Sequence, residues 1–133
     1  MGLIKKLFGI CETKAPADHL SWRVEGERIL LDLSRLPELR DEGGAVCLEG
    51  KDLQTRVFVI RGKKDAFHAL ENRCTHMGRR LDPGKKPGQV SCCSVSGSAF
   101  DLSGNPVAGA AKRGVKSYGV VREGEQLVVS MTP

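Results

Sequence analysis

Apolar residues occur along this chain in short runs that are separated by glycines and charged residues. Runs bounded by turn formers are typical of β-strands, whereas a helix repeats its apolar positions every three or four residues. The segment 54–61 (QTRVFVIR) has a continuous apolar centre and predicts a buried strand. Strands are predicted at residues 28–33, 45–48, 54–61, 66–70, 90–93, 99–102, 106–108, 117–121 and 126–131, with a weaker alternation at 19–24.

About six to nine strands with glycine turns between them predict an all-β fold, an antiparallel β-sandwich or small barrel. Residues 34–39 predict one short helical turn, because Pro37 is tolerated only near a helix start. The hairpin signal Ser103-Gly104-Asn105 separates two of the strands.

The chain has 133 residues, which is enough for one domain with a modest core. We expect an N-terminal tail over residues 1–18 and a single domain over 19–133. The first ten residues (MGLIKKLFGI) are too short and too charged for a signal peptide or a membrane span. Membrane contact is therefore expected to be at most peripheral, through residues 1–10.

Five cysteines at positions 11, 47, 74, 92 and 93 do not form the even set of a secreted disulfide framework. We expect a reducing, cytoplasmic location. The net charge of +5 is spread along the chain, and aromatic residues are too few to stack on bases, so we expect no nucleic-acid partner.

Candidate chemistry is concentrated in residues 71–101. Cys74 and His76 form a Cys-x-His pair followed by Gly78, and sixteen residues lie between His76 and Cys93. The connection is rich in proline and glycine, and a second glycine, Gly97, follows Cys93. Two glycine-containing loops joined in this way suit a loop-held metal site, because glycine lets the backbone pass close to an inorganic core.

This stretch resembles the Rieske [2Fe–2S] domain, whose pattern is Cys-x-His, about sixteen residues, Cys-x-x-His-Gly and then Phe-Asp. Cys74, His76 and Cys93 match three of the four ligand positions, and Ser96 stands where the second histidine belongs. Gly97, Phe100 and Asp101 match the flanking positions. The resemblance, over about residues 20–131, implies a Rieske-like fold with an inserted cluster-binding subdomain of two loops, about 71–101. It also implies a [2Fe–2S] cluster, with thiolates on one iron and imidazole on the other.

The fourth ligand has several candidates. Ser96 is the positional one and would bind as an alkoxide. Cys92 has the better donor atom, but neighbouring strand residues face opposite sides, so we expect a core cysteine there. Water or a side chain of the partner are further candidates. We expect His68 to be a surface histidine, Cys47 to lie in the core and Cys11 to lie in the tail.

The resemblance favours the small ferredoxin-type branch, because the positions of the cysteines that bridge high-potential members are Arg79 and Val95 here. It implies a non-catalytic carrier of single electrons to a reductase or oxygenase partner. A basic rim of Arg79, Arg80, Lys85 and Lys86 would suit an acidic redox partner. Two alternatives are a cluster-free interaction subunit, like the small subunits of nitrite reductases, and a zinc site formed by Cys74, His76 and Cys93.

Overall fold

A computed structural model describes residues 12–75, 78–84, 86–92, 98–109 and 113–131. The described residues form eleven strands and three short 3₁₀ helices, so the predicted all-β class is confirmed, with more strands than expected. The elements are η1 (His19–Ser21), β1 (Trp22–Glu25), β2 (Arg28–Asp32), η2 (Leu33–Arg35), η3 (Pro37–Leu39), β3 (Ala45–Leu48), β4 (Val57–Arg61), β5 (Phe67–Glu71), β6 (Leu81–Pro83), β7 (Gln89–Cys92), β8 (Ala99–Asp101), β9 (Pro106–Ala108), β10 (Ser117–Glu123) and β11 (Gln126–Ser130).

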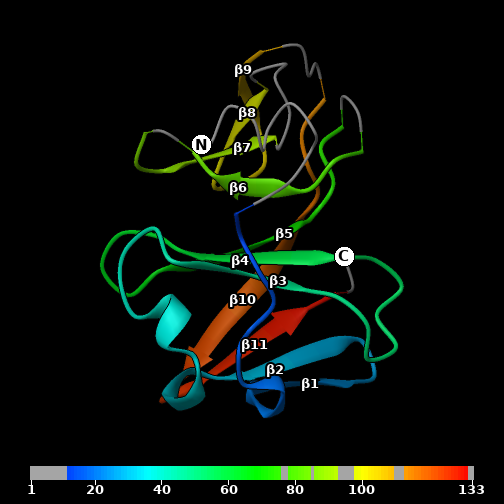
Figure 1. Ribbon diagram of the computed structural model, residues 1–133, viewed down its shortest axis with the longest axis vertical. Coiled ribbons are helices and arrows are strands. Elements are labelled where there is room, and N and C mark those ends of the chain that lie inside the picture. The colour runs from blue at the N-terminus through cyan, green and yellow to red at the C-terminus, as the bar shows by residue number, and fades with distance from the viewer. Residues whose placement is uncertain (1–11, 76–77, 85, 93–97, 110–112, 132–133) are drawn as a thin grey trace.

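Two antiparallel sheets make up the molecule (Figure 1). The large sheet has seven strands in the order β1-β2-β11-β10-β5-β4-β3, and it curls into a half-barrel. The small sheet has four strands in the order β6-β7-β8-β9, and it stands above β3, β4 and β5 in the view of Figure 1. The small sheet is contained in residues 81–108, between β5 and β10 of the large sheet. The expected inserted subdomain is therefore present.

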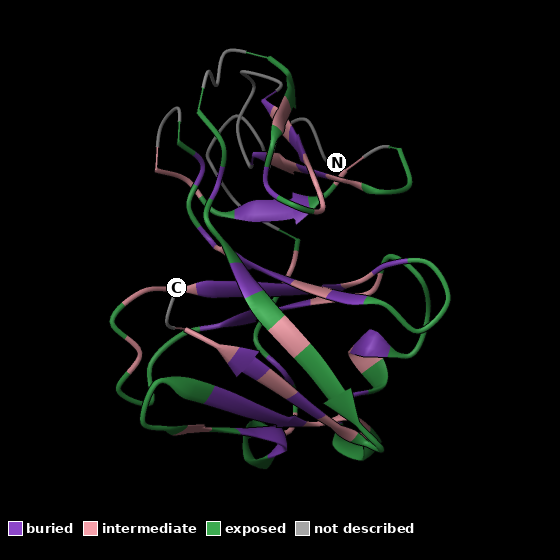
Figure 2. Cartoon of the chain, turned by 180° about the vertical axis from the view of Figure 1, so that it is seen from behind, coloured by how far each residue is buried: buried purple, intermediate pink, exposed green. Residues whose placement is uncertain are grey.

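The inner face of the large sheet encloses the first hydrophobic core (Figure 2). Alternate residues of its strands face this core, among them Ile29, Leu31, Val59 and Leu127, all fully buried. Leu36, between the two short helices η2 and η3, is buried in this core, and the two helices replace the single helical turn predicted at residues 34–39. The remaining members are Trp22, Leu39, Val46, Leu48, Val57, Phe67, Ala69, Tyr118 and Val129.

The second hydrophobic core lies between the two sheets. Phe58 and Ile60 point into it from β4, while Val57 and Val59 of the same strand point into the first core. Both faces of β4 are therefore covered, which explains the continuous apolar run in the sequence. The other members are Leu70, Cys74, Leu81, Val90, Cys92, Phe100 and Val115.

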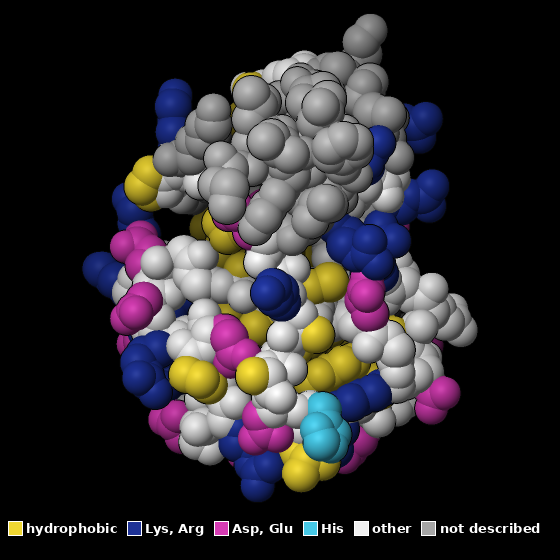
Figure 3. Space-filling model, viewed as in Figure 1, with side chains coloured by type: hydrophobic (Ala, Val, Ile, Leu, Met, Phe, Trp, Pro, Cys, Tyr) yellow, Lys and Arg dark blue, Asp and Glu magenta, His cyan; other side chains and the backbone are white. Residues whose placement is uncertain are grey.

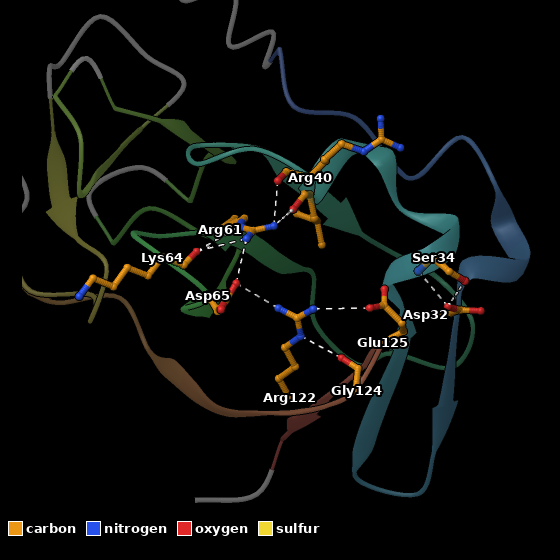
Figure 4. Close-up of polar contacts among 10 residues, drawn as sticks. Asp32, Ser34, Arg40, Arg61, Lys64, Asp65, Arg122, Gly124 and Glu125 are labelled. Atoms are coloured by element: carbon orange, nitrogen blue, oxygen red, sulfur yellow. Dashed lines mark hydrogen bonds and ion pairs between the residues drawn. The ribbon is translucent and has the colours of Figure 1, made fainter.

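A polar network joins the turns at one end of the large sheet (Figure 4). The Arg61 guanidinium donates to the carbonyl oxygen of Arg40 at 2.8 Å and pairs with Asp65 at 3.1 Å. Arg122 of β10 pairs with the same Asp65 carboxylate at 3.3 Å, and both guanidiniums lie over the Phe67 ring. This network fixes the β4–β5 turn against β10.

Residues 12–18 contact both sheets. The backbone N–H groups of Glu12 and Thr13 donate to the buried Asp82 carboxylate at 3.0 and 2.9 Å, and the Lys14 carbonyl accepts from the Cys47 N–H at 3.0 Å. The boundary of the tail at residue 18 stays a prediction. No helix within the described ranges is long and apolar enough to span a membrane.

Candidate metal centre

Cys74 lies at the base of the first ligand loop, just after β5. Its side chain is fully buried in the second core. The Cys74 N–H donates to the Arg79 carbonyl and the Gly78 N–H donates to the Cys74 carbonyl, both at 2.7 Å. Gly78 has a φ of +70°, a left-handed conformation that glycine adopts without strain. These bonds connect the two described ends of the first ligand loop. His76 belongs to this loop in the sequence but lies outside the described residues.

The second ligand loop begins where β7 ends. The Cys92 N–H donates to the Ser98 carbonyl at 2.8 Å, and Ser91 pairs with Ala99 across β7 and β8. These contacts close the ends of the segment 93–97, which contains Cys93 and Ser96 and lies outside the described residues. Leu81 pairs with Cys92, so the end of the first loop lies beside the start of the second.

Cys92 is 1% exposed and is a member of the second core. Burial in β7 alternates, with Val90 and Cys92 buried and Gln89 and Ser91 half-buried. Cys92 is therefore a core cysteine, as expected, and it lies in the same core as Cys74. The assignment of the fourth ligand to Ser96 stays a prediction.

His68 and Cys47 are also placed by the structure. His68 is half-buried in β5 rather than on the surface, because this strand lies under the small sheet, and burial lowers its pKa. Cys47 is buried, as expected. Burial raises the pKa of the Cys47 thiol, and the Glu49 charge raises it further.

Asn72 connects the two sheets below the first ligand loop. It is 1% exposed, its Nδ2 group donates to the Cys47 Sγ at 2.9 Å, and its Oδ1 atom accepts from the Leu81 N–H at 2.7 Å. A buried amide with both ends bonded fixes the geometry around it. Asn72 therefore sets the position of β6 relative to Cys74, two residues further on.

Arg56 bridges both ends of the first ligand loop. Its Nε atom donates to the Asn72 carbonyl at 3.0 Å, and its Nη2 atom donates to the Gly78 carbonyl at 3.1 Å. The planar guanidinium suits such a two-point contact. Sequence reasoning missed Arg56 and Asn72. Asn72 could have been found from its position, because it lies two residues before Cys74 in the sequence. Nothing in the sequence links Arg56 to the loop.

The basic rim differs from the expectation in one respect. Arg80 pairs with Glu49 at 2.7 Å, and Arg56 lies 3.7 Å from the same carboxylate, so the charge of Arg80 is largely balanced. Arg79 is half-buried and Lys86 is exposed, while Lys85 lies outside the described residues. Figure 3 shows lysine and arginine side chains around the small sheet on the face that it views.

The described part of the site fits an iron–sulfur cluster. Cys74 presents a buried thiol in a glycine-containing loop whose backbone bonds are closed, and thiolate sulfur is the donor that such clusters require. Within the described ranges no three His, Cys, Asp or Glu side chains form a metal-binding group. Three of the four predicted ligands lie outside those ranges, so the fit rests on Cys74 and on the closed ends of both loops.

The sequence profile of the Rieske [2Fe–2S] domain matches residues 34–119, which include both loops. This chain belongs to the Rieske [2Fe–2S] domain family. Its cofactor is a [2Fe–2S] cluster, and its role is electron transfer. The recognised family and the predicted cofactor are thus confirmed.

Solved structures support the assignment to this family. The ferredoxin of carbazole 1,9a-dioxygenase from Nocardioides aromaticivorans IC177 has a TM-score of 0.63 and 25% identity, over 77% of this chain and 95% of that chain. The plasma membrane Rieske protein of the cyanobacterium Synechocystis PCC 6803 has a TM-score of 0.52 and 26% identity, over 63% and 85%. The ferredoxin of Sphingomonas yanoikuyae B1 shares the fold, with a TM-score of 0.59 and 21% identity over 70% and 89%. No curated protein sequence matches this chain.

Proposed function

We propose that this chain is a Rieske-type ferredoxin that carries single electrons to an oxygenase or reductase partner. The observation that carries the proposal is the family match across two loops whose described ends are closed by hydrogen bonds, with Cys74 buried at the base of the first. When bound, the cluster supplies a reversible one-electron couple. The protein holds it, tunes its potential and presents it to the partner.

The proposed ligands are Cys74, His76, Cys93 and Ser96. Cys74 and Cys93 provide the thiolates, His76 provides an imidazole at the edge where electrons leave, and Ser96 takes the position of the second histidine. An anionic serine oxygen in place of neutral imidazole adds one negative charge to the site. Negative charge disfavours reduction, so the potential is expected to lie below that of a two-histidine site.

The proposed partner is an oxygenase, with a reductase as the electron donor. Support comes from a neighbour described as a complex of reduced oxygenase and oxidised ferredoxin in carbazole 1,9a-dioxygenase, which has a TM-score of 0.62 and 18% identity over 77% of this chain and 93% of that chain. The net charge of +5 favours a partner with an acidic docking face. We propose a cytoplasmic location, and a domain that spans residues 19–133 with residues 1–18 as an N-terminal segment.

A redox titration of the purified holoprotein tests the function, and Ser96→His tests the ligand set. The wild type is expected to show one reversible one-electron couple, and Ser96→His to raise its midpoint potential by restoring a neutral ligand. Ser103→His, in an exposed turn, is the matched control and should leave the potential unchanged. Absence of a reversible couple in the wild type would contradict the proposed function. An unchanged potential in Ser96→His would remove Ser96 from the ligand set.

A further inference from the structure

A basic groove lies beside the first ligand loop. Its volume is about 320 Å³, and its walls come from the loop itself and from the segment that precedes β10. The lining residues that carry the argument are Glu71, Arg73, Thr75, Arg113, Val115 and Lys116. Three cationic side chains and one carboxylate therefore line the groove, beside Thr75 of the first ligand loop. Arg73 also lines a second hollow, together with Glu49 and Arg56.

The positive charges of this groove are not balanced within the described part of the chain. Neither the Arg73 nor the Arg113 guanidinium forms an ion pair with any described carboxylate, and both side chains are exposed. The Lys116 ammonium lies over the Tyr118 ring, 5.4 Å from its centre, and forms no ion pair with a described carboxylate. By contrast, Arg80, which directly precedes β6, is paired with Glu49.

The walls of the groove are fixed to the ligand loop by hydrogen bonds. The Thr75 hydroxyl, between Cys74 and His76 in the chain, donates to the Arg113 carbonyl at 2.7 Å. The Val115 N–H donates to the Gly104 carbonyl at 2.7 Å, and the Glu71 N–H donates to the Lys116 carbonyl at 2.8 Å. A molecule bound in the groove would therefore lie at a set distance from the loop.

We infer that this groove is the docking site for a carboxylate-bearing segment of the electron-transfer partner, an inference that rests on the proposed function. Guanidinium groups bind carboxylates through two parallel hydrogen bonds, and unpaired arginines are available for this contact. Positive charge beside the first ligand loop also speeds the encounter with an acidic surface, an effect that salt screens. The groove thus selects an acidic partner and orients it towards the first ligand loop.

Binding of a dye-labelled hexaglutamate peptide, measured by fluorescence anisotropy at low salt, tests the groove directly. Arg73→Glu and Arg113→Glu are each expected to raise the dissociation constant about tenfold, which corresponds to about 1.4 kcal/mol. Arg28→Glu is the matched control, because Arg28 is exposed, forms no ion pair with a described residue and begins β2 at the far end of the molecule (Figure 1). Its expected change is less than about twofold.

The inference would be overturned if Arg28→Glu weakened peptide binding as much as the groove variants do. It would also be overturned if neither Arg73→Glu nor Arg113→Glu weakened peptide binding. Arg73→Gln, which removes the charge without reversing it, gives an intermediate loss if the site is real and guards against a folding defect in Arg73→Glu. The peptide assay does not depend on electron transfer. A chain that binds the peptide in this groove and has no reversible couple would contradict the proposed function and leave the groove intact.

A second measurement links the groove to electron transfer. Oxidation of the reduced holoprotein by the anion hexacyanoferrate(III) is expected to slow several-fold in Arg73→Glu, while oxidation by a tripositive cobalt phenanthroline complex speeds up. Arg28→Glu should change both rates little. If the oxidation rates with the two oxidants both rose or both fell in Arg73→Glu, the proposed docking role would be overturned.

Discussion

Single side chains from outside the first ligand loop hold it in place. Arg56 contacts the backbone on both sides of Cys74, and Asn72 ties the same region to Cys47 and Leu81. The contacts of Arg56 are to carbonyl oxygens, which any loop sequence would offer. Its role therefore depends on its place in the fold and leaves no motif in the sequence.

Substitutions of Arg56 are expected to separate the effect of its hydrogen bonds on cluster retention from the effect of its charge on the midpoint potential. Arg56→Gln removes both the bridge and a positive charge, so cluster release, followed as loss of visible absorbance, should become several-fold faster and the midpoint potential should fall. Arg56→Lys keeps the charge but cannot reach both carbonyls in the same way. It should release the cluster faster while it keeps a nearly native potential.

Arg23→Gln, which breaks an exposed ion pair with Glu25, is the control for a change of surface charge. If Arg56 had a purely structural role, Arg56→Gln would lower the melting temperature and leave the midpoint potential of the cluster unchanged. That result would contradict the proposed effect of its charge.

Asp101 gives a pH-dependent contribution to the turn between β8 and β9. Partial burial raises the pKa of this carboxyl, but hydrogen bonds from Asn105, Ser103 and Gly104 outweigh that effect, so the pKa is lowered overall. A group with a depressed folded pKa stabilises the fold above its unfolded pKa of about 3.9, and the contribution is lost as the pH falls through the folded value.

The melting temperature of Asp101→Asn, compared with the wild type, measures this contribution. The variant should be less stable at pH 7, and the gap should shrink as the pH falls from about 5 to about 2. A gap that stays constant with pH would mean that the Asp101 charge is not what stabilises the turn.

At the scale of elements, most strands of both sheets could be predicted from the sequence. The strand Ala45–Leu48 and the short Pro106–Ala108 match their predicted bounds, because each is an apolar run closed by glycine or polar residues. A strand was predicted at 54–61, but β4 begins at Val57, three residues after the predicted start. Only the apolar centre of this segment packs against both hydrophobic cores.

Strand β6 was not predicted. Leu81–Pro83 lies in the stretch rich in proline and glycine between the two halves of the motif, and its pattern alone indicates a turn. Pairing with β7 and the hydrogen bond from the Leu81 N–H to Asn72 make it a strand. Contacts with neighbouring segments, rather than its own sequence pattern, decided this element. The fourth ligand remains a prediction because Ser96 lies outside the described residues.

Gly104, in the turn between β8 and β9, supports the segment that forms one wall of the groove. Its φ is +92°, and a Cβ atom there would overlap the Val115 carbonyl oxygen. Gly104→Ala should therefore destabilise the fold by about 3 kcal/mol and shift residues 113–116. Gly43→Ala is at a similar φ, +86°, but has open space around the added atom, so about 1 kcal/mol is expected.

Chemical denaturation of the two glycine variants measures the difference. Equal destabilisation would show that backbone conformation, and not the contact with Val115, sets the cost at Gly104.

At the scale of the whole molecule, the two hydrophobic cores differ in their relation to the cluster site. Among the described residues, the first core, enclosed by the large sheet, contains no proposed ligand, whereas the second core lies between the sheets and contains Cys74. We therefore expect the large sheet to stay folded when the cluster is lost, and the small sheet and its loops to lose stability.

Removal of the cluster with a chelator under reducing conditions is expected to affect the two sheets differently. Hydrogen exchange should become faster at the amides of β7 and β8, because the ligand loops that join and flank them lose their anchor. The amides of β2 and β11 should keep their protection. Uniform loss of protection across both sheets would contradict this division.

The central claim, that the chain carries electrons on a [2Fe–2S] cluster, is tested most directly by anaerobic purification. Iron and acid-labile sulfide are counted, and an electron paramagnetic resonance spectrum is recorded after reduction with dithionite. The account predicts near-stoichiometric iron and sulfide, about two of each per chain, and the signal of a reduced cluster. A colourless, iron-free protein that remains folded would contradict it and would favour a cluster-free interaction subunit.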